Sequence, residues 1–183
     1  MESFPDDDVL DATALLQRAG VGVGMTVADF GVGREGSFLL AAGHMVTARG
    51  TVYALDVVQD ILRFVEEMAN SAGVQNVTTV WTDLEMYGAA ERVKDESVDV
   101  GILANTLFQS TQKEAMVKEC MRMMKTGGTL LMVDWKPVNT AFGPPAEQRV
   151  GPDEMKQIVH TVGGTIIESF EAGEYHWGLL VQK

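Results

Sequence analysis

The chain has 183 residues, of which 46% are hydrophobic and 22% charged, and its formal net charge at pH 7 is −12. This length and composition are typical of one globular domain, and no apolar run approaches the roughly 20 residues that a membrane-spanning helix needs. The negative charge, without a local Lys/Arg cluster, argues against a nucleic-acid or anionic-membrane partner, because cationic side chains drive binding to phosphates.

The N-terminal residues 1–20 are expected to form a helical lead-in. The run Asp6–Asp8 is acidic where a secretory signal would be basic and then apolar, so we expect a cytoplasmic protein and a solvated start of the chain. The following residues predict a helix over Asp11–Ala19 that ends at Gly20.

Short apolar runs then alternate with longer helical patterns. We expect strands at Thr26–Phe30, Thr51–Leu55, Val77–Trp81, Val98–Ala104 and Thr129–Asp134. We expect helices at Gly36–Thr47, Gln59–Ala72 and Thr111–Met124, the last ended by the glycines of Thr126–Gly128. This alternation predicts a doubly wound α/β fold, with a mostly parallel sheet and helices on both of its faces.

The rhythm changes after the fifth strand. Residues 136–151 contain three prolines and predict a long loop, which is either a lid over an acceptor site or an irregular connection. A helix at Pro152–Thr161 and a hairpin of Thr165–Phe170 and Tyr175–Val181 follow. The hairpin adds to five parallel strands, so we predict a seven-stranded sheet within a single domain over residues 1–183.

A glycine-rich turn follows the first strand. Gly31 and Gly33 allow the backbone to lie against a ligand, and the helix behind them offers free N–H donors. The sequence motif G-x-G-x-x-G is compatible with a dinucleotide-binding site, or with a glycine turn needed only for packing of the strand against the helix. Asp29, however, would repel a pyrophosphate and suits a cationic ligand such as S-adenosylmethionine, which carries an ammonium and a sulfonium group.

Acids also end the next two strands. Asp56 can accept hydrogen bonds from both hydroxyls of a ribose, and capping of the following helix is its alternative or additional role. Asp83 lies where an adenine amino group would arrive if Asp56 holds the ribose, and its alternative role is that of a surface turn residue. The three strand ends therefore predict one nucleoside-binding edge of the sheet.

Together these segments resemble motifs I, II and III of the class I S-adenosylmethionine-dependent methyltransferases. The resemblance covers roughly residues 10–182, and this wider run resembles the generic small-molecule methyltransferase domain, whose relatives include ubiquinone/menaquinone biosynthesis and arsenite methyltransferases. Its matching segments are Asp29–Gly33, Tyr53–Asp56, Asp83–Leu84, Asp99–Leu107 and Leu130–Asp134.

The resemblance implies an enzyme that binds S-adenosylmethionine and methylates a small-molecule acceptor. It places Asp56 at the ribose, Asp83 beside the adenine and Asn105 at the methionine part. The cofactor-binding residues that we expect are Asp29, Phe30, Gly31, Val32, Gly33, Asp56, Val57, Asp83, Leu84 and Asn105.

Two positions depart from the family pattern. Glu35 stands where the third glycine of motif I is usual, and Gly36 comes one place late, so either the loop shifts by one residue or cofactor affinity suffers. Phe108 stands where the family often has a histidine, so a base is absent there. Phe108 is expected to shape an apolar acceptor pocket or to fill the core.

Other chemistry is not indicated. The lone Cys120 lacks the partners that arsenite methylation requires, and Met116, Met121, Met123 and Met124 are expected in the core. His44, His160 and His176 lack metal-ligand spacing, so no metal is assigned and packing or surface roles are expected, although His176, Trp135 and Lys136 could face the acceptor. A protein or RNA methyltransferase, a nicotinamide-dependent oxidoreductase and a non-catalytic binding module remain alternatives, and the oligomeric state is open.

Overall fold

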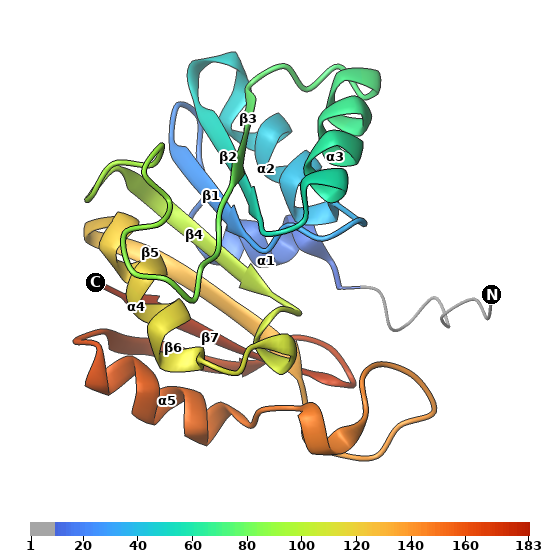
Figure 1. Cartoon of the computed structure of the whole chain (residues 1–183), viewed down its shortest axis with the longest axis vertical. Coiled ribbons are helices and arrows are strands. Elements are labelled where there is room, and N and C mark those ends of the chain that lie inside the picture. Colours follow the sequence, from blue (N-terminus) through green and yellow to red (C-terminus); the bar gives the residue numbers. More distant parts are fainter. Residues whose placement is uncertain (1–9) are drawn as a thin grey trace.

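The structure of the protein is a computed structural model that describes residues 10–183, so the acidic run Asp6–Asp8 lies outside the described residues. One seven-stranded sheet forms its centre, with the strand order β3-β2-β1-β4-β5-β7-β6 (Figure 1). The strands are β1 (Thr26–Phe30), β2 (Thr51–Asp56), β3 (Val77–Trp81), β4 (Val98–Ala104), β5 (Met124–Trp135), β6 (Thr165–Glu171) and β7 (His176–Gln182).

Helices cover both faces of this sheet (Figure 1). The α-helices are α1 (Ala12–Arg18), α2 (Ser37–Val46), α3 (Gln59–Ser71), α4 (Lys113–Met123) and α5 (Pro152–Thr161). Short 3₁₀ turns are η2 (Thr47–Arg49), η3 (Leu107–Gln109) and η4 (Ala146–Gln148). The apolar sides of α1, α2 and α3 pack on one face, and those of α4 and α5 pack on the other. Within residues 10–183, no helix is both long and apolar enough to cross a membrane.

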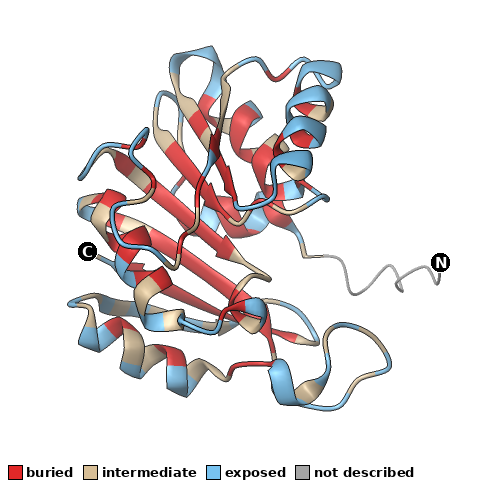
Figure 2. Ribbon diagram, viewed as in Figure 1, coloured by how far each residue is buried: buried red, intermediate tan, exposed pale blue. Residues whose placement is uncertain are grey.

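Side-chain alternation along the central strands explains why both faces are covered. In β5, Leu130 and Met132 belong to the core under α4 and α5, whereas Leu131 and Val133 belong to the core under α1, α2 and α3. All four are fully buried, and Figure 2 shows buried residues running along the middle strands. A strand buried on both sides needs a continuous apolar run, which is the pattern that made the strands predictable.

The connections place a crevice at the carboxyl edge of the sheet. Strands β1 to β5 are parallel, and β1 lies between β2 and β4, so the chain reverses its direction of winding there. Ligands of open α/β sheets bind at such a switch point, beyond the carboxyl ends of the strands. The predicted doubly wound fold is confirmed, including its terminal hairpin: β7 pairs antiparallel with both β5 and β6.

The expected glycine stop after α4 is wrong. The helix ends at Met123, and Met124 is already extended and paired with Val98 of β4. Met124 is fully buried, and burial of its apolar side chain favours the extended conformation at this position. The strand therefore begins directly after the helix. Gly127 instead makes a turn with φ +81° at the start of β5, where its N–H donates to the carbonyl of Lys183 over 2.9 Å.

The segment 82–97, between β3 and β4, covers the sheet without a regular helix. Its apolar residues Leu84, Ala90 and Val93 are buried in the core beneath α4. The fully buried carboxylate of Glu119, on α4, accepts hydrogen bonds from the N–H groups of Gly88 at 2.8 Å and Ala90 at 3.2 Å. One side chain of α4 thus replaces the internal hydrogen bonds that a helix would supply.

Candidate active site

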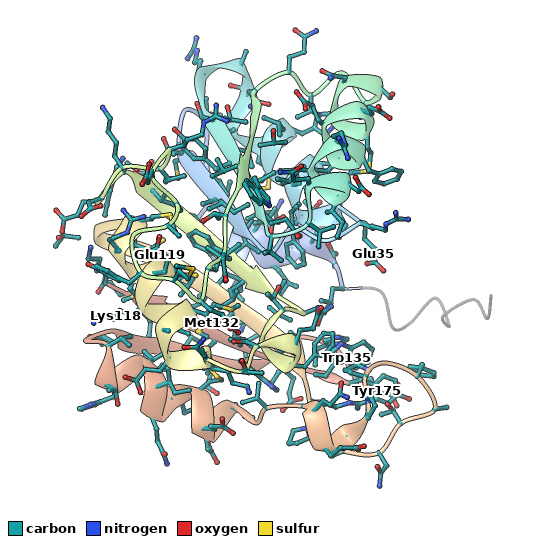
Figure 3. The ribbon with its side chains drawn as sticks, viewed as in Figure 1. Glu35, Lys118, Glu119, Met132, Trp135 and Tyr175 are labelled. Carbon is teal, nitrogen blue, oxygen red and sulfur yellow. The ribbon has the colours of Figure 1, made fainter. Side chains whose placement is uncertain are left out.

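A cavity of about 920 Å³ lies at the carboxyl edge of the sheet. Its walls come from the glycine loop after β1, the residues after β2, β3 and β4, the end of β5 and the start of β7. Two residues of the loop 136–151, Gly143 and Pro144, close its far end. In Figure 3, Glu35 of the glycine loop and Trp135 of β5 lie toward the same edge of the molecule.

The glycine loop adopts a backbone shape that side chains would oppose. Gly31 has φ +79°, and a Cβ there would lie 2.7 Å from the side chain of Thr106. Gly36 has φ +58°, caps the start of α2, and leaves room for the Met68 side chain, whose Cε would be 2.2 Å from an added Cβ. Gly36 is therefore the glycine at the start of α2, one residue after the position where the family pattern has its third glycine. Glu35 is exposed beside the cavity.

Asp29, at the end of β1, is the unusual charge of this site. It is only 4% exposed, and no donor in the described part of the chain hydrogen-bonds to its carboxylate. Burial, followed by repulsion from Asp56, raises the pKa of Asp29 to about 7. A buried carboxylate without a partner is costly, and a cationic ligand group would remove that cost.

Asp56 and Asp83 are held in place by backbone groups. Asp56 accepts hydrogen bonds from the N–H of Val58 at 2.9 Å and of Gly33 at 3.2 Å, so it both holds the start of α3 and fastens the glycine loop. Asp83 accepts from the N–H of Glu85 at 2.9 Å. Both line the cavity with oxygen lone pairs to spare, as acceptors for hydroxyl and amino groups should.

Three buried polar side-chain atoms of cavity-lining residues lack a hydrogen-bond partner among the described residues, and two of them are oxygens. The side-chain oxygens of Asn105 and Thr82 are buried, and no described group hydrogen-bonds to them. Asn105 also has φ +52°, a left-handed conformation that costs energy for a residue with a side chain. Orphaned oxygens and the buried Asp29 suit a ligand rich in N–H and O–H donors, which S-adenosylmethionine is. The residues present therefore fit this cofactor.

The structure brings nearly all of the expected cofactor residues together. Asp29, Gly31, Val32, Gly33, Asp56, Val57, Asp83, Leu84 and Asn105 all line the one cavity. Phe30 does not line the cavity, because its side chain is fully buried in the core under α4. Successive side chains of β1 point to opposite faces of the sheet, so Phe30 and Asp29 point in opposite directions.

The far end of the cavity is aromatic. Trp135 and His176 are paired across β5 and β7, with ring centroids 4.2 Å apart, and Phe108 adds an apolar wall. Gly143 lies so close that a Cβ there would come 2.8 Å from the Trp135 ring. Lys136, in contrast, points to the β6–β7 turn, where it pairs with Glu171 and does not line the cavity.

Arg149 is a structural residue that sequence reasoning missed. Its guanidinium donates to four carbonyls of the loop 136–151, including Pro144 at 2.8 Å and Val138 at 2.7 Å, and to the hydroxyl of Thr140 at 2.7 Å. It also stacks over Trp135, with 5.1 Å from Cζ to the ring centroid. The loop is thus built around one buried cation, and a single Arg in a proline-rich stretch is the only sequence signal for it.

We expect Arg149→Met to loosen this loop. The variant removes the charged donor from four partly buried carbonyls, so the free energy of unfolding should fall by about 2–4 kcal/mol, because hydrogen bonds from a charged donor are worth about 1.5–3 kcal/mol each and are not additive. Limited proteolysis should cut the variant within residues 136–151 much faster than the wild type. Arg63→Met, at an exposed position of α3, is the matched control. Equal cleavage of both variants would contradict this role.

Fold and site together define a Rossmann-like, S-adenosylmethionine-dependent methyltransferase. A sequence model of the methyltransferase domain family matches residues 22–171, so the chain belongs to that family. The described residues contain no cluster of His, Cys, Asp or Glu that could hold a metal ion.

Individual relatives agree with this family. A SAM-dependent methyltransferase of Aquifex aeolicus has a TM-score of 0.86 and 28% identity, and the match covers 94% of this chain and 89% of that one. An S-adenosylmethionine-dependent methyltransferase of Mesorhizobium loti shares the fold at 14% identity, with a TM-score of 0.74 and 97% and 99% coverage. A ubiquinone/menaquinone biosynthesis C-methyltransferase of Shewanella woodyi is 26% identical over 87% of this chain, which spans only 61% of that relative.

Proposed function

We propose that this methyltransferase methylates a carbon atom of a small planar acceptor. The observation that carries the proposal is the single cavity of about 920 Å³ that joins the acidic, glycine-lined half to the aromatic half. Its likeness to C-methyltransferases of quinone biosynthesis supports carbon as the target. The domain spanning residues 1–183 is proposed to act as one unit.

The first half of the cavity is proposed to bind S-adenosylmethionine. Asp29 and Asn105 would accept from its ammonium group, Asp56 from the ribose hydroxyls and Asp83 from the adenine amino group. Gly31 and Gly33 would let the backbone approach the ligand, with Val32, Val57 and Leu84 as apolar contacts. When bound, the cofactor supplies a methyl group activated by its sulfonium.

The second half is proposed to align the acceptor. Methyl transfer is an in-line displacement, so holding the acceptor carbon in line and excluding water supplies much of the rate. Phe108, Trp135 and Pro144 provide flat apolar walls for this purpose. A carbon atom is nucleophilic enough when electron-donating hydroxyl groups enrich its ring, which makes a reduced, hydroxylated aromatic the fitting acceptor.

Two measurements test the proposal in sequence. Calorimetric titration with S-adenosylmethionine and S-adenosylhomocysteine should give micromolar binding, whereas NADH and NADPH should not bind. Anaerobic incubation with S-adenosylmethionine and 1,4-dihydroxynaphthalene should then release S-adenosylhomocysteine and give a product that is heavier by one CH2 unit in mass spectrometry, because the methyl group replaces a ring hydrogen that leaves as a proton. Failure of the first measurement would overturn the cofactor site, and failure of the second alone would overturn the acceptor class.

The ribose contact makes a separate prediction. Asp56→Ala should weaken S-adenosylhomocysteine binding by about 1–3 kcal/mol in calorimetry, because two hydrogen bonds to the ribose and the anchor of the Gly33 N–H are lost. The control Asp60→Ala removes an exposed acid from α3, the helix that follows Asp56, and should bind like the wild type. Unchanged affinity in a folded Asp56→Ala protein would reject the ribose assignment.

A further inference from the structure

His176 is a buried polar residue at the aromatic end of the cavity, where its ring packs against Trp135 but its Nε2 atom has no hydrogen-bond partner among the described residues. It is 3% exposed, begins β7, and lines the cavity beside Trp135. Its Nε2 atom is enclosed, and no described group hydrogen-bonds to it. Buried polar side chains are paired in the great majority of cases, so an unpaired imidazole in a ligand cavity points to a ligand as its partner.

The surroundings fix the charge of this imidazole. Burial, followed by the positive charges of Arg149 and Lys136, lowers the pKa of His176 to about 4, so the ring is neutral at pH 7. Arg149 is bound to loop carbonyls and Lys136 to Glu171, so neither cation is available to hydrogen-bond a ligand in place of the histidine. A neutral imidazole carries one N–H and one nitrogen that accepts.

We propose that His176 determines acceptor specificity, by accepting a hydrogen bond from an aromatic hydroxyl of a neutral, planar acceptor. The flat apolar faces of Trp135 and Phe108 favour a ring, and the two nearby cations disfavour a positively charged acceptor. A site that hydrogen-bonds a hydroxyl rejects the analogue that lacks it, because its own polar group is then left unpaired. This inference rests on the proposed function, which assigns the aromatic half to the acceptor.

The test compares two ligands that differ only in the donor. Protein saturated with S-adenosylhomocysteine is titrated calorimetrically with 2-naphthol and with 2-methoxynaphthalene, whose ether oxygen cannot donate. Wild-type protein should bind 2-naphthol about tenfold more tightly, the value of one net hydrogen bond. His176→Phe, which keeps a ring against Trp135, should lose that tenfold preference and bind 2-methoxynaphthalene within about twofold of wild type.

Two further variants complete the design. His176→Asn keeps an accepting atom and should recover part of the preference for 2-naphthol. His160→Phe makes the same change at an exposed position of α5 and should leave all affinities unchanged. Wild-type protein that binds the two naphthalenes equally, or that binds neither, would overturn the inference even if His176→Phe does not fold. If the wild-type protein does not bind S-adenosylhomocysteine, that result would instead overturn the proposed function.

Discussion

Asp29→Asn should make the unliganded protein more stable while weakening cofactor binding about 100-fold. The carboxylate is buried without a donor, and its pKa is raised from 3.8 to about 7. That shift corresponds to a penalty of up to about 4 kcal/mol for the ionised form in the folded state. An amide avoids the penalty but cannot form a charge-assisted bond with the ligand ammonium, which is worth about 1.5–3 kcal/mol.

The sign of the pH dependence identifies Asp29 as the source. Because its pKa is raised on folding, the folded protein binds more protons than the unfolded chain between pH 4 and 7, so this residue makes stability fall as pH rises through that range. The difference in unfolding free energy between Asp29→Asn and wild type, from urea titrations, should therefore grow from pH 4 to 7 and level off above. The buried Asp134 is present in both proteins and cancels.

Cofactor affinity should follow the opposite trend. The ligand ammonium favours the ionised carboxylate, and the ligand α-amino group stays protonated below pH 7. Wild-type affinity for S-adenosylhomocysteine should thus rise about fivefold from pH 6 to 7, since the ionised fraction of a group with a pKa of about 7 rises from about one tenth to one half. The affinity of Asp29→Asn for S-adenosylhomocysteine should not change between pH 6 and 7. The affinity of Asp153→Asn, an exposed control variant, should change with pH as that of the wild type does. A pH-independent wild type would exclude this role of Asp29.

The fold was predictable because its information is local. Runs such as Val100–Ala104 are apolar throughout, as strands buried on both faces must be. Asp29, Asp56 and Asp83 each come at or near a strand end in the sequence. Parallel strands bring those ends to one edge without any further knowledge of packing. The glycine stop of α4 failed because the burial of Met124 in β5 outweighed the local glycine signal.

The acceptor half was predictable only in part: His176 and Trp135 were named from the sequence and line the cavity, Lys136 was named and does not, and the role of Arg149 was missed. Arg149, His176 and Trp135 become neighbours only because β7 enters between β5 and β6 and the loop 136–151 folds back over them. The residues next to each of them in the sequence do not show that these three side chains meet. Glu119 reads as one more polar residue of a helix, although it is fully buried, because its partners Gly88 and Ala90 lie about 30 residues earlier.

Glu119→Ala should lower the free energy of unfolding by about 3–5 kcal/mol. Glu119 accepts two hydrogen bonds of 2.8 Å from Arg122, whose side chain is 9% exposed, in addition to those from Gly88 and Ala90. Removing the carboxylate leaves the N–H groups of Gly88 and Ala90 without their acceptor. It also takes from the Arg122 guanidinium its fully buried partner, so that the exposed Asp95 is the one acid that still pairs with it in the described residues. Thermal and urea unfolding measure the loss, and Glu114→Ala, exposed on the same helix, should change little.

If the loss of stability in Glu119→Ala comes from the negative charge of Glu119, it should depend on pH. Burial opposes ionisation of Glu119, but the hydrogen bonds from Arg122, Gly88 and Ala90 outweigh it and lower its pKa. A lowered pKa stabilises the folded state above the unfolded value of about 4.3, and that contribution disappears as pH falls through the folded pKa. The stability gap between wild type and Glu119→Ala should therefore shrink in acid.

The double variant Glu119→Met/Arg122→Met separates the ion pair from the backbone contacts. It should recover part of the stability lost by Glu119→Ala, because no guanidinium stays buried with only the exposed Asp95 as its acid partner, while the N–H groups of Gly88 and Ala90 remain without their acceptor. Amide hydrogen exchange in residues 86–93 should thus be fast in both proteins. Because this segment follows directly on Asp83 and Leu84 at the cavity, S-adenosylhomocysteine affinity should fall in both as well. Slow exchange with wild-type affinity in the double variant would show that the apolar core alone holds the segment in place.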